Sequence, residues 1–217
     1  MILYFTGIDG SGKSTLIDDI QKHLIDNKVE TLRIWARYSP RFSKMIVNIA
    51  KKKAVNHTGN YNTISEEEYS RWQSFKKRLV RNKIIRDLIF TFFYLDYYFQ
   101  ILSVQAKIKK NKNKVILIDR FVIDFLADQM VNFGDLSGTG IFRRIIKISN
   151  SFDAVFFISV KPDVALKRKS DIPGKEYLIE RDIVFREIFK ELDRGHIIDN
   201  NGPRDLAIRE ITSIINL

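Results

Sequence analysis

The sequence contains no cysteine among its 217 residues, and only three histidines and four prolines. Without cysteine, disulfide bridges and metal sites built on thiolates are excluded. His23, His57 and His196 lack the spacing of metal ligands, so we expect them to be incidental to the chemistry. A reducing, cytoplasmic location is compatible with this composition. The first residues predict a strand at once, without the basic region and small-residue cleavage site of a signal peptide.

Long hydrophobic runs are also missing. The most apolar stretch, residues 88–102, contains Asp96 and follows Arg86 and Asp87. It is too short and too charged to predict a membrane span. The hydrophobic fraction of 45% is nevertheless enough for one well-packed core. Because the chain has no internal repeat, linker or low-complexity tail, residues 1–217 are predicted to form one domain.

Acidic residues are outnumbered by basic ones, and the formal net charge is +11. Three interpretations are open: solvated helix faces, steering of phosphorylated substrates toward a cleft, and a surface for nucleic acid or anionic membranes. The third ranks lowest because no recognised nucleic-acid-binding module accompanies the charge. The basic clusters lie at residues 51–53, 71–86, 107–114 and 167–169.

Residues 7–14 read Gly-Ile-Asp-Gly-Ser-Gly-Lys-Ser, which matches the spacing Gly-x-x-x-x-Gly-Lys-Ser/Thr. An apolar run precedes them, and apolar residues at helical spacing follow, so the pattern is strand, glycine loop, helix. Glycines let backbone N–H groups close around phosphate oxygens, and the helix N-terminus adds partial positive charge. Lys13 can reach the β and γ phosphates, and the Ser14 hydroxyl can ligate magnesium. The segment therefore predicts a phosphate-binding loop, or P-loop; a glycine-rich turn before an ordinary helix is the weaker alternative.

Short β-rich runs alternate with helical patterns along the whole chain. Two of the runs are almost wholly apolar, which is typical of strands covered on both faces. The alternation predicts βαβ units around a parallel sheet, in which ligands bind at the carboxyl ends of the strands. The predicted strands are residues 2–6, 31–35, 115–118, 154–160 and 196–198.

One long helical segment is predicted between the second and third strands. It opens at a capping box, Ser65 to Glu68, and continues to about Gln105, either as one helix or as two joined near Asn82. Polar or glycine-rich segments predict loops at residues 111–114, 132–140 and 200–203.

The third predicted strand, 115–118, is followed by an acid and a base, Asp119 and Arg120. An aspartate at a strand end beside a P-loop is placed to hold magnesium or its waters, or to orient an acceptor oxygen. Arg120 can offer a bidentate fork to phosphate. A solvated Asp–Arg pair is the alternative, and the nearby P-loop favours the functional interpretation.

At these residues the chain resembles the thymidylate kinases, a family of P-loop nucleoside-monophosphate kinases. The P-loop is shared by many families, whereas Ile-Asp-Arg-Phe at 118–121 is similar to this family's Asp-Arg-Tyr/Phe signature. Ala127 and Gln129 resemble its Ala-Tyr-Gln segment, and residues 160–168 resemble the strand, loop and helix that lead into its lid. The resemblance covers essentially the whole chain.

The resemblance implies an α/β P-loop NTPase fold: a five-stranded parallel sheet with helices on both faces and a short basic lid at about residues 168–181. It implies ATP as the phosphoryl donor, with Mg²⁺ held by Ser14 and Asp119. The implied ATP-binding residues are Gly7, Ile8, Asp9, Gly10, Ser11, Gly12, Lys13, Ser14 and Thr15.

The implied catalytic residues are Lys13, Asp119, Arg120 and, from the lid, Arg168. Arg181 is a second lid candidate. For Arg168 an ordinary exposed helix charge is an equally open interpretation, because lids vary and exposed charges contribute little.

On the acceptor side the resemblance is less complete. Residues 37–41, Arg-Tyr-Ser-Pro-Arg, are close to one form of the family's Arg-Phe-Pro-x-Arg, so Arg41 is expected to clamp the acceptor phosphate. Asp9 is expected near the acceptor sugar, and Phe93 matches the phenylalanine that stacks on the base. An aromatic stripe is as typical of a core as of a base platform, so both interpretations of Phe93 are open. The implied acceptor-binding residues are Asp9, Arg37, Arg41, Phe93, Tyr97, Arg120 and Gln129.

Three positions depart from the family pattern, and all of them fall on the acceptor side. Tyr97 stands where the family has arginine, Asp128 replaces the tyrosine before the glutamine, and Asp124 stands where a small polar residue is usual. The donor chemistry is therefore expected to be intact, while the identity of the acceptor is open.

The predicted activity is ATP- and Mg²⁺-dependent transfer of a phosphoryl group to a nucleoside monophosphate, with dTMP the nearest acceptor by resemblance. One alternative is a kinase of the same fold that acts on another phosphorylated or hydroxyl-bearing small molecule. The other, motivated by the net charge, is a nucleotide-dependent switch or nucleic-acid-binding NTPase. The expected partners are small-molecule nucleotides, without nucleic acid, and the family implies a homodimer formed through helices.

Overall fold

A computed structural model describes residues 1–55, 71, 74–76, 78, 80–169, 171, 172 and 174–215. Its centre is a five-stranded sheet in the order β2-β3-β1-β4-β5, in which every pair of neighbouring strands is parallel. This architecture confirms the α/β fold class predicted from the sequence. The strands are β1 (Ile2–Thr6), β2 (Thr31–Trp35), β3 (Val115–Asp119), β4 (Ala154–Ser159) and β5 (Gly195–Asp199).

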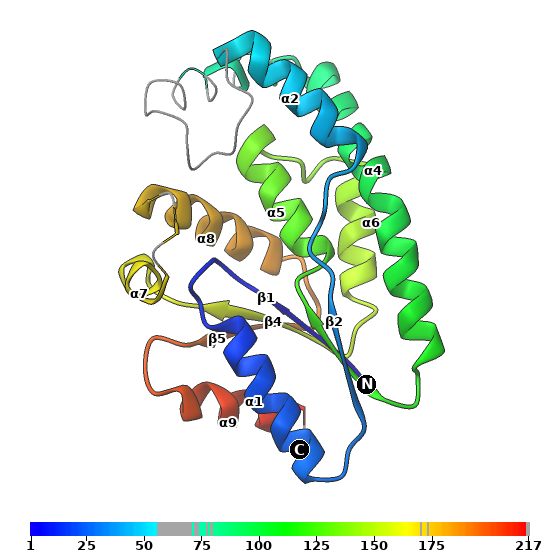
Figure 1. Ribbon diagram of the computed structural model, residues 1–217, viewed down its shortest axis with the longest axis vertical. Helices are drawn as coiled ribbons and strands as arrows, with labels where there is room; N and C mark the ends of the chain where they lie inside the picture. Colours follow the sequence, from blue (N-terminus) through cyan, green and yellow to red (C-terminus); the bar gives the residue numbers. More distant parts are fainter. Residues whose placement is uncertain are drawn as a thin grey trace.

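The sheet is sandwiched between two layers of helices (Figure 1). One layer consists of α1 (Lys13–Asp26) and α9 (Arg204–Ile214), and the other consists of α4 (Lys83–Lys110), α5 (Val122–Phe133), α6 (Gly140–Ser149) and α8 (Lys175–Phe189). Because side chains alternate along a strand, β1 sends Leu3 and Phe5 into the first layer and Tyr4 into the second. Each face of the sheet therefore has its own buried hydrophobic cluster.

Two further helices, α2 and α7, lie at the carboxyl end of the sheet and adjoin the segments that were predicted to bind the substrates. Helix α2 (Phe42–Val55) follows β2 and packs against α4, and α7 (Pro162–Arg168) follows β4. The segment expected to form a lid includes the end of α7 and the first half of α8, with residues 170 and 173 outside the described part of the chain.

The long predicted helical segment has a boundary where the sequence suggested one. Asn82 caps α4: its side-chain oxygen accepts hydrogen bonds from the backbone N–H groups of Ile84 and Ile85 at 2.9 and 3.3 Å. The helix runs on to Lys110, five residues beyond the predicted Gln105, and the basic residues of its last turn favour that C-terminus. The capping box at Ser65 to Glu68 lies outside the described residues, as does His57.

The remaining boundaries differ from prediction by a few residues. Strand β3 includes Asp119, β4 ends at Ser159, and β5 extends beyond both predicted ends. The predicted loop at 132–140 is shorter, because α5 continues to Phe133 and α6 begins at Gly140. None of the described helices is long and apolar enough to cross a membrane.

Candidate active site

The loop between β1 and α1 has a backbone that requires glycine at two of its turns. Gly10 and Gly12 have φ values of 78° and 84°, in the left-handed region that other residues rarely adopt. A Cβ atom on Gly10 would lie 2.5 Å from the carbonyl oxygen of Ala165, and one on Gly12 would lie 2.7 Å from Nδ2 of Asn200. The segments after β4 and β5 therefore press directly against the loop and hold its shape.

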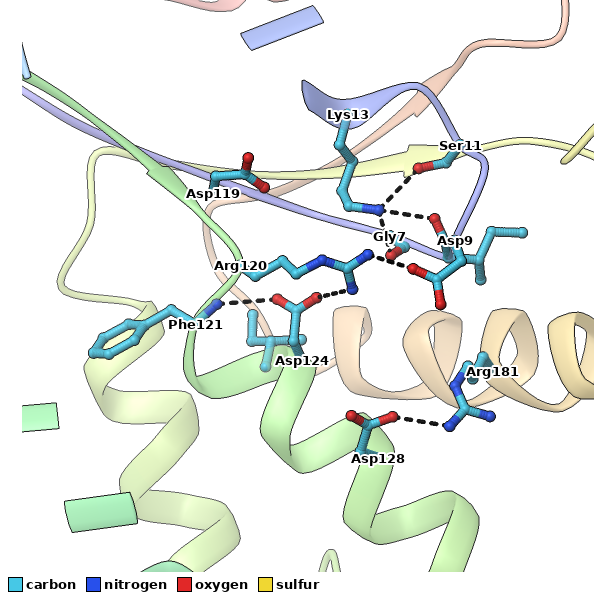
Figure 2. Close-up of polar contacts among 12 residues, drawn as sticks. Gly7, Asp9, Ser11, Lys13, Asp119, Arg120, Phe121, Asp124, Asp128 and Arg181 are labelled. Atoms are coloured by element: carbon cyan, nitrogen blue, oxygen red, sulfur yellow. Dashed lines mark hydrogen bonds and ion pairs between the residues drawn. The ribbon is translucent and has the colours of Figure 1, made fainter. Parts of the chain in front are cut away.

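Lys13 is the first residue of α1, and its side chain folds back over the loop that precedes it (Figure 2). Its Nζ donates to the carbonyl oxygens of Gly7 and Ile8 at 2.7 and 2.8 Å and to Oγ of Ser11 at 3.2 Å. Burial, assisted by the nearby Arg120 guanidinium, lowers the pKa of Lys13 to about 7. A phosphate group next to this ammonium would restore its ordinary affinity for a proton, because an opposite charge favours the charged form.

Asp119 lies at the carboxyl end of β3, beside the P-loop strand β1. Its Oδ2 accepts a hydrogen bond from Oγ of Ser14 at 3.3 Å. The same oxygen forms an ion pair with Nη2 of Arg33 at 2.6 Å. Ser14 and Asp119 therefore bring two oxygen donors together, which is the ligand chemistry that Mg²⁺ prefers. The described residues contain no cluster of three or more His, Asp or Glu that would hold a metal alone. The pair suits an ion that takes its remaining ligands from phosphate and water.

Arg120 follows Asp119 with a φ of 63°, which is uncommon for a residue other than glycine. Its backbone N–H donates to the carbonyl of Phe5 at 3.0 Å, and its guanidinium bridges two carboxylates. Nη2 contacts Asp9 at 2.6 Å, and Nη1 contacts Asp124 at 3.3 Å (Figure 2). Burial favours the neutral acid at Asp9, but the charges of Arg120 and Lys13 outweigh it and lower the pKa of Asp9 to about 2. The strained backbone thus orients one guanidinium toward the P-loop.

Asp124 has a second task besides pairing with Arg120. Its Oδ2 accepts from the backbone N–H of Phe121 at 3.1 Å and from the hydroxyl of Tyr4 at 2.9 Å, so it caps the first turn of α5. Burial raises the pKa of Asp124 above its ordinary value, although Arg120 and Lys13 act in the opposite direction. Asp124 is therefore a buried link between β1, Arg120 and α5.

The two candidate lid arginines lie at different places. Nη2 of Arg168 donates to the backbone oxygen of Asn200 at 3.0 Å, and Nδ2 of Asn200 donates to the backbone oxygen of Ser11 at 2.7 Å. Arg168 is therefore tied to the P-loop through the segment after β5. Sequence reasoning did not single out Asn200, although the polar turn that contains it was predicted as a loop.

Arg181 lies on α8, where it faces α5. Its Nη2 contacts Oδ1 of Asp128 at 3.0 Å (Figure 2), and its guanidinium lies 3.6 Å from the centre of the Tyr177 ring. The Tyr177 hydroxyl donates to Oδ2 of Asp9 at 3.3 Å. One face of α8 is thus linked to the P-loop through Asp9 and to α5 through Asp128.

The loop between β2 and α2, for which the sequence predicts acceptor binding, carries Arg37 and Arg41, whose side chains are exposed. Asp96, a buried carboxylate in α4, holds this loop: it accepts from the backbone N–H groups of Arg41, Phe42 and Ser43 at 3.0–3.2 Å. It also accepts from the hydroxyl groups of Ser43 at 2.6 Å and Tyr38 at 2.9 Å. Burial alone would raise the pKa of Asp96, but these hydrogen bonds lower it to about 2. The one feature of the sequence that could have indicated this role is the position of Asp96 as a single carboxylate among the aromatic residues of α4.

The aromatic side chains of α4 mostly belong to the core. Tyr97 is fully buried, its hydroxyl donates to the carbonyl of Ala36 at 3.1 Å, and its ring lies 4.8 Å from that of Phe125. Tyr97 thus supports the loop between β2 and α2 from the core, and its expected contact with the acceptor stays a prediction. Phe93 is half-buried, with its ring 5.9 Å from that of Phe133. Gln129 is buried, and its Oε1 has no hydrogen-bond partner among the described residues.

Together the fold and this geometry define a P-loop α/β protein with an acid–base pair beside the loop. A scan against models of known protein families finds no match. A search of characterised proteins finds the thymidylate kinase of Finegoldia magna (strain ATCC 29328 / DSM 20472 / WAL 2508), with 26% identity over 222 residues. The similarity covers 99% of this chain and 92% of the relative. This distant, full-length similarity supports a thymidylate-kinase-like relationship and a phosphotransferase.

Proposed function

We propose that this protein transfers the γ-phosphoryl group of ATP to a nucleoside monophosphate, and that dTMP is its first candidate acceptor. The observation that carries the proposal is the juxtaposition of the Lys13 loop and the Asp119–Arg120 pair at the carboxyl ends of β1 and β3. Ligands bind at this edge of parallel sheets. The full-length similarity to a thymidylate kinase supports the same activity.

In this proposal the protein positions its substrates and neutralises charge rather than forming covalent intermediates. Lys13 leaves its carbonyl partners to meet the phosphates, and Arg120 meets the transferred group. Ser14 and Asp119 would hold Mg²⁺, which supplies charge neutralisation between the phosphates when bound. Arg168, which contacts the segment after β5, is the donor-side lid candidate, and Arg181, which is linked through Tyr177 to Asp9, is the acceptor-side one. A basic lid at about residues 168–181 over one domain stays a prediction.

The acceptor is less constrained than the donor. Arg37 and Arg41 are proposed to bind its phosphate, and Phe93 and Gln129 to contact its base. Because Tyr97 is buried where the family has arginine, an acceptor other than dTMP is the second candidate. The nucleotide-dependent switch draws its support from net charge alone.

A panel of acceptors with coupled detection of ADP release tests the proposal. We expect ATP-dependent turnover with nucleoside monophosphates, highest for dTMP. Turnover with a different phosphorylated or hydroxyl-bearing acceptor, and none with dTMP, would favour the second candidate. ATP hydrolysis that polynucleotide stimulates and acceptors leave unchanged would favour the switch.

We also propose that the protein forms a homodimer through α4. One face of this helix exposes large apolar side chains at helical spacing, and such patches mark contact surfaces. They are Ile84, Leu88, Leu95, Phe99 and Leu102. Sedimentation analysis should give twice the chain mass, and Phe99→Glu should give the monomer. A cytoplasmic location is likewise a prediction, which fractionation would test.

A further inference from the structure

Arg33 is a charged residue in the middle of β2, whose sequence Thr-Leu-Arg-Ile-Trp is otherwise typical of a sheet strand. Its guanidinium reaches two carboxylates on different elements. Nη2 lies 2.6 Å from Oδ2 of Asp119, and Nη1 contacts Oδ1 of Asp18 on α1. The Asp119 side chain is 3% exposed, whereas those of Arg33 and Asp18 are 29% and 63% exposed. Arg33 therefore connects a buried carboxylate to one near the surface.

The oxygen of Asp119 that Arg33 contacts is also the one that accepts from the Ser14 hydroxyl, at 3.3 Å. Ser14 and Asp119 are the two groups that suit a divalent cation, and the guanidinium is paired with the Asp119 oxygen that lies next to the Ser14 hydroxyl. Two cations close to one carboxylate repel each other, and burial of the carboxylate strengthens every charge interaction around it. Arg33 and a metal ion at this position are therefore competitors.

We propose that Arg33 is a built-in counter-cation that compensates the buried charge of Asp119 and yields its place to a divalent metal. Asp18 allows Arg33 to leave Asp119, because it keeps the guanidinium paired when Asp119 binds the metal. Arg33 is a positioning residue, and it makes metal binding weaker than Ser14 and Asp119 alone would allow. The inference deepens the proposed function, since it rests on the metal pair named there.

The test is binding of Mn²⁺ alone to the nucleotide-free protein, followed by the electron paramagnetic resonance signal of the free ion. In Arg33→Gln the side chain keeps a polar amide, but the positive charge is gone. We expect Arg33→Gln to bind Mn²⁺ about fivefold more tightly than wild type, because one repelling charge has been removed. Arg33→Lys restores the charge and should return the affinity to the wild-type value.

A matched control is the ion pair of Arg204, on α9, with Asp19, which follows Asp18 on α1. Arg204 pairs with Asp19 of α1 at 3.1 Å, so Arg204→Gln removes one arginine from a neighbouring carboxylate without touching Asp119. This variant should bind Mn²⁺ as wild type does. Equal affinities of wild type and Arg33→Gln, or no Mn²⁺ binding by either, would overturn the inference.

The Mn²⁺ readout does not depend on kinase activity, so the two proposals can fail separately. A blank acceptor panel together with tighter Mn²⁺ binding by Arg33→Gln would leave the counter-cation role standing and remove the proposed reaction. Turnover of an acceptor with unchanged Mn²⁺ affinity would remove the role of Arg33 alone.

Thermal unfolding without metal provides a second measurement. Arg33→Gln should have a lower melting temperature than wild type, since the buried Asp119 loses its compensating charge. Mn²⁺ should raise that melting temperature more than NaCl of equal ionic strength does.

Discussion

The P-loop and the segment between β2 and α2 are both held by hydrogen bonds to buried charged groups, but these bonds span different distances along the chain. Lys13 binds carbonyl oxygens only five and six residues away. Asp96 and Tyr97 bind backbone groups of the β2–α2 loop and of the first turn of α2 from 53 to 61 residues away. The contacts of Lys13 are therefore specified by a local motif, although Ala165 and Asn200 press on the same loop from distant segments. The contacts of Asp96 and Tyr97 exist only when α4 packs against the β2–α2 segment.

The largest expected effect belongs to the local region. Lys13→Ala should lower kcat by about a thousandfold or more, which corresponds to about 4 kcal/mol of transition-state stabilisation. The reason is that Lys13 carries the charge closest to the P-loop backbone, whereas the fold is held by strands that do not depend on it. Circular dichroism should show an intact fold. Activity within tenfold of wild type would remove Lys13 from the chemistry.

The long-range region should respond in stability and in acceptor binding. Asp96→Ala leaves five donors without their acceptor and should lower the free energy of unfolding by about 3 kcal/mol in urea titrations. The KM for the acceptor should rise while ATP affinity stays near wild type, because the loop that moves carries Arg37 and Arg41. Asp87→Ala, on the same helix but paired only with the adjacent Arg86 in the described contacts, should cost less than about 1 kcal/mol. Equal losses in the two variants would contradict the role of Asp96.

Asp96 also predicts a pH dependence. Its pKa of about 2 in the folded protein lies below the ordinary value of 3.8. The stabilisation is therefore complete above about pH 4 and is lost as the pH falls from 4 toward 2. Unfolding titrations should show a shallower loss over this interval in Asp96→Ala than in wild type. Parallel pH profiles would mean that the carboxylate is not held as described.

Glycine substitutions test whether contact with α7 constrains the P-loop. Gly10→Ala places a Cβ atom 2.5 Å from the Ala165 carbonyl at a φ of 78°, so it should destabilise the protein by about 2 kcal/mol. Gly138→Ala is the control, since its Cβ would meet nothing within 4 Å and its φ is not in the left-handed region. It should change the melting temperature little. A similar loss in both variants would show that contact with α7 does not constrain the loop.

Sequence reasoning succeeded where the physical cause is local. The alternation of apolar strands and helical segments was enough to predict the five strands and the parallel sheet, because a buried strand has a short, nearly continuous run of apolar residues. The P-loop was recognisable because glycine, lysine and serine must occur at fixed spacing around phosphate. The Asn82 boundary of α4 was visible for the same reason, as a cap acts on the next three residues.

The contacts that sequence reasoning missed are those that depend on packing. Nothing near Arg33 in the chain shows that β2 lies beside β3 and aims the guanidinium at Asp119. Tyr97 aligns with a position where the resembled family has arginine, yet its depth in the core is decided by Phe125 and Ala36 on other elements. Alignment places a residue on a helix, whereas the neighbouring helices decide whether its side chain meets a ligand or the core.

Calorimetric titration of ATP with MgCl₂ at pH 8, in buffers of different ionisation enthalpy, tests the central claim most directly. Because the pKa of Lys13 is about 7 in the free protein and should rise beside phosphate, wild type is predicted to take up about one proton per bound nucleotide. Lys13→Ala should bind more weakly and take up none. Absence of binding heat in every buffer, or a heat that does not vary with the buffer in wild type, would contradict the claim that this lysine and its loop enclose the triphosphate.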